Sequence, residues 1–297
     1  MLDYALLDAL AAVIRYGSFD RAASALNVTP SAVSQRVKLL EERVGSVLVK
    51  RGQPCTATTS GALLCRHTER VKLLESELTG QMPSMPGSLA ESWPTLRVAV
   101  NDDSVGTWFV DAAAPFCVER ETLLDLVIDD QDHTAQRIRD GSVQGAVTTQ
   151  AEPVQGCRST RLGRMRYLAV ASPSFSARYF ADGVNRDSLR RAPCVVFNPK
   201  DALQTRFIRR ITRAEVDPPL HWIPHVGGFL RAAMTGMGWG MCPVPMISAH
   251  LAAGDLVDIA PGKYLDVDLY WQSWRLSIGW LDDFGAELKK RAGAFLD

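Results

Sequence analysis

Residues 21–37, with the sequence RAASALNVTPSAVSQRV, decide the fold of the N-terminal part of the chain. Small residues over 22–25 allow a neighbouring helix to approach closely, and residues 27–28 make a tight turn. Thr29 then caps the next helix, and Pro30 takes its first position, where the missing N–H of proline costs nothing. Two short helices joined by so short a turn predict a helix-turn-helix.

The second helix of this motif, predicted over residues 30–41, has an apolar and a polar side. Val33, Val37 and Leu40 recur at helical spacing and are expected to face the core. The polar side suits base edges and phosphates in a major groove. Its members are Ser31, Ser34, Gln35, Arg36 and Lys38. The solvated face of an ordinary helix has the same composition, so this helix alone leaves both interpretations open.

Working outward from the motif, two further helices are predicted. Apolar residues at helical spacing over 6–14 indicate a first helix that ends at Gly17, and Ser18 caps a helix from about residue 19 to 26. After the motif, helical period returns over residues 62–78. Proline, glycine and serine over 82–88 then predict a hinge.

Over more than forty residues the chain resembles LysR-type transcription regulators. The resemblance is carried by residues 21–37, 40–45 and 48–51, in the order of their small, polar and apolar positions. It implies a winged helix-turn-helix DNA-binding domain over residues 1–60, with the wing over 50–59. Thr58 would start the next helix, with Gly61 in its first turn.

The resemblance also implies which residues contact double-stranded DNA. Lys50 and Arg51 on the wing would hold phosphates, which position a domain without reading sequence. Relatives often carry another basic residue where Thr56 stands here. The predicted DNA contacts are Arg21, Thr29, Pro30, Ser31, Ser34, Gln35, Arg36, Lys38, Lys50 and Arg51.

Residues 61–93 are expected to form a linker helix and hinge. In LysR-type proteins the corresponding helix pairs with that of a second subunit, which implies a homodimer or a homotetramer. A two-fold dimer places its recognition helices in successive major grooves about 34 Å apart. A two-fold symmetric operator is therefore expected.

The amino-acid composition limits the classes of function that the chain can have. With 297 residues, 46% of them hydrophobic and 22% charged, the chain has an ordinary globular balance and room for about two domains. A formal net charge of zero argues against an architectural protein that binds any DNA sequence, which is the alternative class of DNA-binding protein. No apolar run is long enough to cross a bilayer and no signal peptide is evident, so a cytoplasmic location without a membrane partner is expected.

We expect neither catalytic residues nor a metal or other cofactor, and therefore no enzyme. The six cysteines are scattered without a Cys-x-x-Cys pair, so free thiols are favoured over a zinc site. No nucleophile motif such as Gly-x-Ser-x-Gly occurs, and the five histidines have no paired spacing. The sequence of residues 236–240, with glycine at every second position, lies between a predicted helix and a predicted strand, so it indicates a turn rather than a nucleotide-binding loop.

Beyond residue 94, short apolar strands alternate with helical segments, which predicts a parallel-type α/β sheet. The strands are predicted over 96–100, 124–128, 145–148, 167–171, 194–197 and 241–243. The LysR resemblance implies that residues 94–297 form a two-lobed α/β effector-binding domain similar to type II periplasmic solute-binding proteins, and the whole chain is then α+β. Lobe I would take about 94–165 and 267–297, and lobe II about 166–266.

Several segments of this half are similar to one branch of the family, the regulators of lysine and arginine export. They are residues 101–104, 107–108, 145–150, 179–184, 192–197 and 269–271. The resemblance implies that L-lysine or L-arginine is the effector, and that the chain regulates export genes together with RNA polymerase. A regulator of another metabolic operon, with a different effector, is the alternative.

A cationic effector needs carboxylates in its cleft, because an unpaired buried charge is very costly. The ends of the first two strands supply Asp102, Asp103, Asp129, Asp130 and Asp132. Ligands gather at such strand ends in α/β folds. Acidic residues in loops are more often simply solvated, so each of them also has this simpler interpretation. Asp102, Asp103 and Asp130 are retained as predicted effector contacts.

The α-carboxylate of the effector needs hydroxyls or helix N-terminal amides. The hydroxyls are expected from Ser104, Thr107, Thr148 and Thr149, and Trp108 either covers the aliphatic stem or lies in the core. Relatives of this branch carry polar side chains in the segment 225–229. Here Gly227 and Gly228 leave backbone amides to bind the carboxylate, and glycine permits close approach.

Overall fold

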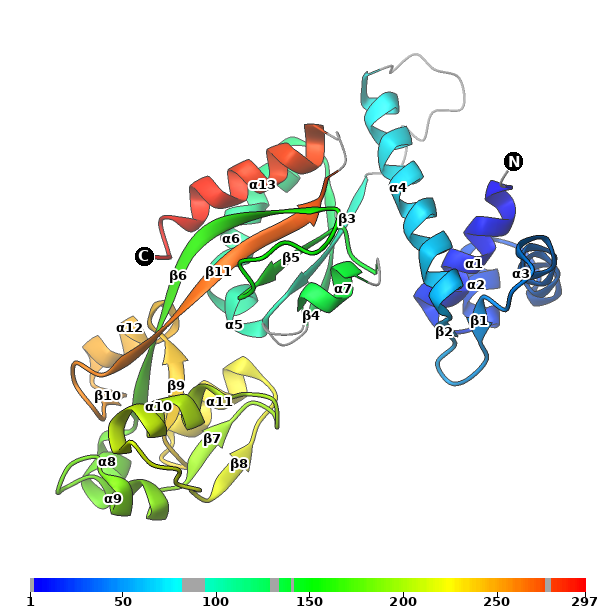
Figure 1. Ribbon diagram of the computed structural model, residues 1–297. Helices are drawn as coiled ribbons and strands as arrows, with labels where there is room; N and C mark the ends of the chain where they lie inside the picture. The colour runs from blue at the N-terminus through cyan, green and yellow to red at the C-terminus, as the bar shows by residue number, and fades with distance from the viewer. Residues whose placement is uncertain (1–2, 82–93, 129–133, 140–141, 276–278) are drawn as a thin grey trace.

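The computed structural model describes residues 3–81, 94–128, 134–139, 142–275 and 279–297. Figure 1 shows a small helical domain at the N-terminus and a larger domain with a long curved sheet, joined through the long helix α4 (Thr59–Gln81). The predicted effector contact Asp130, with its neighbours Asp129 and Asp132, lies outside the described residues.

The N-terminal domain contains three helices and a two-stranded wing. Its elements are α1 (Tyr4–Tyr16), α2 (Phe19–Ala25), α3 (Pro30–Val44), β1 (Val49–Lys50) and β2 (Thr56–Ala57). Thr29 caps α3 as predicted, since its Oγ1 accepts a hydrogen bond from the Ala32 N–H at 3.2 Å. Ser18 occupies the N-cap position of α2, but its hydroxyl makes no capping hydrogen bond to the described backbone.

Helix α4 starts against the wing. Thr58 Oγ1 accepts a hydrogen bond from the Gly61 N–H at 3.1 Å and donates one to the Val47 carbonyl at 2.8 Å. A Cβ added at Gly61 would lie 2.1 Å from the Leu48 carbonyl oxygen, so only glycine fits this first turn. The helix is 23 residues long and extends beyond the predicted segment at both ends.

The C-terminal domain is built on a seven-stranded mixed sheet with the order β10-β6-β11-β5-β3-β4, in which β9 also pairs with β6. The strands are β3 (Thr95–Val100), β4 (Leu123–Ile128), β5 (Gly145–Thr148), β6 (Cys157–Ala171), β9 (Gly240–Pro243), β10 (Val257–Asp258) and β11 (Tyr264–Trp274). In this sheet β3 pairs in parallel with β4 and β5, and in a separate two-stranded sheet β7 (Cys194–Val196) pairs in parallel with β8 (Leu220–Trp222). The expected parallel-type pairing therefore holds for these strands and is wrong for the long strands β6 and β11, which are antiparallel neighbours.

Strands β6 and β11 pass through both lobes, as Figure 1 shows, and a separate group of elements lies at each end of them. Lobe I contains β3, β4 and β5 with α5 (Asp102–Ser104), the π-helix η1 (Val105–Phe109), α6 (Val110–Glu119), α7 (Thr134–Arg139) and α13 (Gly279–Ala292). Lobe II contains β9 and β10 with α8 (Pro173–Tyr179), α9 (Arg186–Arg191), β7 (Cys194–Val196), α10 (Leu203–Thr212), β8 (Leu220–Trp222), α11 (Val226–Met234) and α12 (Val244–Ala253). The two long strands are shared by the lobes, and the lobe boundaries expected from the sequence stay a prediction.

Several contacts join the N-terminal half to lobe I, among them the hydrogen bond from Gln144 Nε2 to Glu69 Oε2 at 3.4 Å. The guanidinium of Arg70 on α4 lies 5.1 Å from the ring centroid of Trp274 at the end of β11. Arg15 on α1 forms an ion pair of 3.2 Å with Asp125 on β4, and Arg97 on β3 pairs with the same carboxylate oxygen at 3.3 Å. These contacts place the DNA-binding domain against the edge of the sheet.

The residues 236–240 form a turn between α11 and β9, as the sequence predicted, with Gly236 at a φ of 78°. All six cysteines are free, and Cys55, Cys157, Cys194 and Cys242 are buried. Among the described residues, no helix is both long enough and apolar enough to cross a bilayer.

Candidate effector pocket and DNA-binding surface

Helix α3 presents a polar face to solvent. Val33, Val37 and Leu40 are buried in the core of the N-terminal domain, as predicted from their spacing. On the other side Ser31, Gln35 and Lys38 are exposed, and Ser34 and Arg36 are half-buried. The arrangement leaves short hydroxyls at the start of the helix and longer polar side chains further along, which suits insertion into a major groove.

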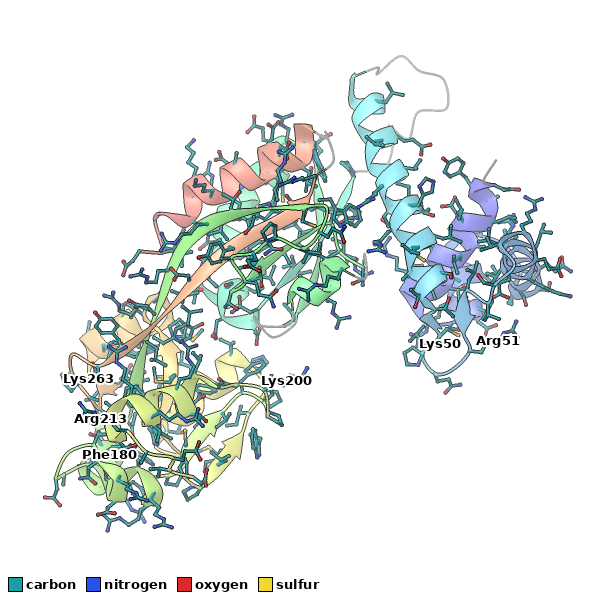
Figure 2. The ribbon with its side chains drawn as sticks, viewed as in Figure 1. Lys50, Arg51, Phe180, Lys200, Arg213 and Lys263 are labelled. Carbon is teal, nitrogen blue, oxygen red and sulfur yellow. The ribbon has the colours of Figure 1, made fainter. Side chains whose placement is uncertain are left out.

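The two cations of the wing, Lys50 and Arg51, lie at the end of β1 and directly after it. Lys50 and Arg51 are both exposed, and Figure 2 shows them beside each other on the loop that leaves β1. The Arg51 guanidinium lies 5.3 Å from the centroid of the Phe19 ring, a cation–π contact that limits its freedom. Arg21 is exposed on α2. The predicted DNA contacts therefore come from α2, α3 and the wing.

A pocket of about 730 Å³ lies where the first strand of lobe I ends and the helices of lobe II begin. Both lobes and the strand β9 contribute to its wall. The lining residues are Asn101, Asp102, Asp103, Phe197, Lys200, Asp201, Ala202, Leu203, Arg206, Val226, Phe229, Met241, Cys242, Pro243 and Met246.

Asp102 and Asp103, two of the predicted effector contacts, line this pocket. Asp102 Oδ2 accepts a hydrogen bond from the Val226 N–H at 3.2 Å, across from lobe I to the first residue of α11. Asp103 Oδ2 accepts one from the Tyr167 hydroxyl at 2.8 Å. Burial, together with the Asp103 carboxylate, raises the pKa of Tyr167 well above its usual value, so this hydroxyl stays protonated and donates.

The hydroxyl groups predicted to bind a carboxylate do not line the pocket. Thr107 Oγ1 donates to the Asp103 carbonyl at 2.6 Å, and Thr148 Oγ1 accepts from the Gln150 N–H at 3.2 Å. Ser104 is fully buried, Thr148 is fully buried, and Thr149 is half-buried. Their role in effector binding stays a prediction.

Trp108 lies in the core of lobe I, fully buried, within the π-helix η1. Its Nε1, with the Ser104 hydroxyl and Asn101 Oδ1, has no hydrogen-bond partner among the described residues. Single π-helical turns are frequent at functional sites, and unsatisfied buried polar atoms need an explanation. These three atoms belong to the segment that follows β3, whose Asn101, Asp102 and Asp103 line the pocket.

The N-terminus of α11 is already capped. His225 Nδ1 accepts a hydrogen bond from the Gly228 N–H at 2.9 Å, and a Cβ added at Gly227 would lie 3.2 Å from the His225 ring. With Val226 bound to Asp102, two of the first amides of this helix are satisfied within the chain. Gly227 and Gly228 therefore make room for the His225 cap, and they are not among the lining residues.

Sequence reasoning missed the charged side chains of lobe II. Lys200 and Arg206 bring two cations to the pocket, and Asp201 a third carboxylate. Lys200 and Asp201 belong to a tight turn after β7, in which Asn198 Oδ1 accepts from the Lys200 N–H at 2.7 Å, and Arg206 lies on α10. The signal was the same as for Asp102, since polar residues follow directly on the end of a strand in the sequence Asn198-Pro-Lys-Asp201.

A winged helix-turn-helix, a long linker helix and a two-lobed domain with a pocket between its lobes define a DNA-binding transcription regulator with an effector-binding domain. The chain belongs to the LysR family of such regulators. The model of the bacterial regulatory helix-turn-helix protein, lysR family, matches residues 4–62, and the model of the LysR substrate binding domain matches residues 91–289.

Individual relatives cover almost the whole chain. The HTH-type transcriptional regulator ArgP of Pseudomonas aeruginosa (strain UCBPP-PA14) is 44% identical over 293 residues, which are 99% of this chain and 97% of that protein. The crystal structure of ArgP from Mycobacterium tuberculosis superposes with a TM-score of 0.83 at 43% identity, covering 100% of this chain and 99% of that one. Full-length LysG from Corynebacterium glutamicum, with bound effector Arg, superposes with a TM-score of 0.73 at 36% identity and covers 99% of both chains.

Proposed function

We propose that the chain regulates the transcription of amino-acid export genes in response to a basic amino acid, L-arginine or L-lysine. The observation that carries this proposal is the charge of the pocket. Asp102, Asp103 and Asp201 bring three carboxylates against the two cations Lys200 and Arg206, which leaves one negative charge in excess. Free arginine and lysine each carry one positive charge in excess at neutral pH, so the charges of site and effector are complementary.

The apolar part of the pocket supports the same class of effector. Phe197, Leu203, Phe229 and Met246 line it between the charged groups. An aliphatic stem of three or four methylene groups would pack against such side chains while its charged ends reach the polar ones. The bound arginine named for LysG of C. glutamicum is a ligand of this chemistry.

The remaining parts of the proposal follow from the family. The ten predicted residues of α2, α3 and the wing would contact a two-fold symmetric operator, and α4 would pair with that of a second subunit in a homodimer or homotetramer. We propose a cytoplasmic location, a functional contact with RNA polymerase, and no enzymatic activity. The domain limits would be 1–60, 61–93 and 94–297.

The test is the thermal stability of the purified chain in a panel of L- and D-arginine, L- and D-lysine, and neutral and acidic amino acids. A ligand that binds only the native state stabilises it, by about 2.7 kcal/mol when the ligand concentration is a hundred times Kd. The melting temperature rises accordingly. Selective stabilisation by L-arginine or L-lysine is expected. Stabilisation by none of the basic amino acids would reject this effector class, and the capped N-terminus of α11 would then be the place to seek another one.

A further inference from the structure

The charged groups of the pocket are sorted between the two lobes. Asp102 and Asp103 follow β3 in lobe I, whereas Lys200 and Arg206 lie on the turn after β7 and on α10 in lobe II. Figure 2 shows Lys200 on the side of lobe II that is turned toward lobe I. A ligand with a positive and a negative end therefore meets opposite charges on opposite lobes.

The third carboxylate of the pocket has a structural task. Asp201 accepts hydrogen bonds from the Phe197 N–H at 3.2 Å and from the Leu203 N–H at 3.0 Å. Its side chain thereby closes the turn that presents Lys200 and the first residues of α10. Asp201 still adds its negative charge to the pocket, and the other two carboxylates come from lobe I.

Two backbone amides in the first turn of α11, which a carboxylate could otherwise use, are taken. The Val226 N–H donates to Asp102, and the Gly228 N–H donates to His225 Nδ1, so the N-terminus of α11 is occupied by groups of the chain itself. An incoming carboxylate would have to displace a carboxylate that is held in place by the fold. Side-chain cations are the alternative anion site in the pocket.

Lys200 and Arg206 are suited to that task because both are exposed and neither forms an ion pair with a described residue. Their neighbours on α10 are engaged elsewhere. Arg209 pairs with Glu215, and the Arg210 guanidinium lies 5.7 Å from the Tyr264 ring centroid. The two cations of the pocket are thus the ones on this segment left to bind a ligand.

We propose that Lys200 and Arg206 bind the α-carboxylate of the effector, while Asp102 and Asp103 bind its cationic groups, the α-ammonium and the side-chain guanidinium or ammonium, so that the ligand links lobe II to lobe I. This inference rests on the proposed function and adds the direction in which the ligand lies. If Lys200 and Arg206 bind the α-carboxylate, tight binding requires that this group is free. Amines without an α-carboxylate are then expected to bind weakly.

The test combines a change in the ligand with a change in the protein. The dissociation constants of L-arginine and of L-argininamide, which has a neutral amide in place of the α-carboxylate, are measured by calorimetry on the full chain and on Lys200→Gln and Arg206→Gln. Arg209→Gln is the matched control, because it removes one positive charge from the same helix outside the pocket. Melting temperatures without ligand, expected within a few degrees of the wild type, show that each variant folds.

Each pocket variant is expected to bind L-arginine about tenfold or more weakly, since a hydrogen bond to a charged group is lost, and to bind L-argininamide within about twofold of the wild type. The control should change neither constant by more than about twofold. Equal weakening of both ligands, or no weakening of L-arginine, would overturn the inference while the proposed function stands. Failure of the wild type to bind either L-arginine or L-lysine would instead remove the proposed function, and this inference with it.

Discussion

Gly61 shows how one residue couples the DNA-binding wing to the linker helix. The amide of Gly61 is held by Thr58, and the space where a side chain would begin is filled by the Leu48 carbonyl oxygen. Leu48 itself is fully buried in the core of the N-terminal domain. Backbone cannot move aside as a side chain does, so this position tolerates no Cβ.

We expect Gly61→Ala to destabilise the N-terminal domain by about 1–3 kcal/mol, the usual cost of forcing extra atoms into a packed site. Urea unfolding followed by circular dichroism measures the change. The neighbouring substitution Ser60→Ala is the control and should stay within about 0.5 kcal/mol of the wild type. Equal stability of the two variants would mean that α4 can shift away from the wing without cost.

At the scale of single elements, the wing is expected to bind DNA phosphates through its positive charges. Lys50→Gln should weaken operator binding and reduce the slope of log K against log salt concentration by about 1, because one phosphate contact is lost. Fluorescence anisotropy with labelled operator DNA over a salt series measures this slope. Lys263→Gln, on lobe II far from the wing in Figure 2, removes the same charge and should leave the slope unchanged. A slope that Lys50→Gln does not alter would place Lys50 outside the DNA contact.

The pair of strands that joins the lobes carries a ladder of ion pairs. Asp268 on β11 faces Arg161 and Arg164 on β6, with the shortest distance, 2.8 Å, to Arg161 Nη2. Asp266 pairs in the same way with Arg166 at 2.9 Å. Hydrogen bonding to Arg161, followed by the charges of both arginines, holds the pKa of Asp268 below its usual value of 3.8.

A lowered pKa in the folded state means that this ion pair stabilises the fold above about pH 4, and that the contribution is lost as the pH falls through the lowered value. We therefore expect the difference in melting temperature between the wild type and Asp268→Asn to be present at pH 6 and to shrink toward zero as the pH falls through the lowered pKa of Asp268. Differential scanning calorimetry over this range checks it. The group is exposed, so the effect at pH 6 is small. A difference that stays constant with pH would show that the substitution acts through packing.

At the scale of the whole molecule, an ion pair of Asp125 connects the DNA-binding domain to the effector-binding domain. Arg15 reaches it from α1 and Arg97 from the neighbouring strand, both on the same oxygen. When the domains separate, Arg97 still pairs with the carboxylate, and the partly exposed Arg15 guanidinium is left to water. Exposed ion pairs of this kind contribute about 0.2–1 kcal/mol, which is small enough for a ligand or DNA to shift the balance.

We expect Arg15→Gln to increase the radius of gyration of the chain at low salt, measured by small-angle X-ray scattering. The wild type should reach the same value at about 1 M salt, where screening acts over about 3 Å. Arg43→Gln, which breaks an ion pair with Asp3 inside the N-terminal domain, is the control and should have no such effect. An unchanged radius for Arg15→Gln would show that the contacts of α4 with Trp274 and Gln144 hold the domains without it.

Elements whose signals are local in sequence were predicted well. The helix-turn-helix, its Thr29 cap, the inward residues of α3 and the position of most strands depend on spacing and capping within a few residues, and these are read directly from the chain. The acidic half of the pocket was found for a similar reason, because Asp102 and Asp103 stand directly after a predicted strand.

The family, the helix-turn-helix and one wall of the pocket were therefore predictable from the sequence. The tertiary structure alone decided the rest, because contacts between residues about a hundred positions apart leave no periodic signal. The antiparallel pairing of β6 with β11 replaced the expected parallel-type arrangement. The same packing brings Lys200 and Arg206 opposite Asp102, and fills the N-terminus of α11 with His225 and Asp102, where glycine amides were expected to be open to a ligand.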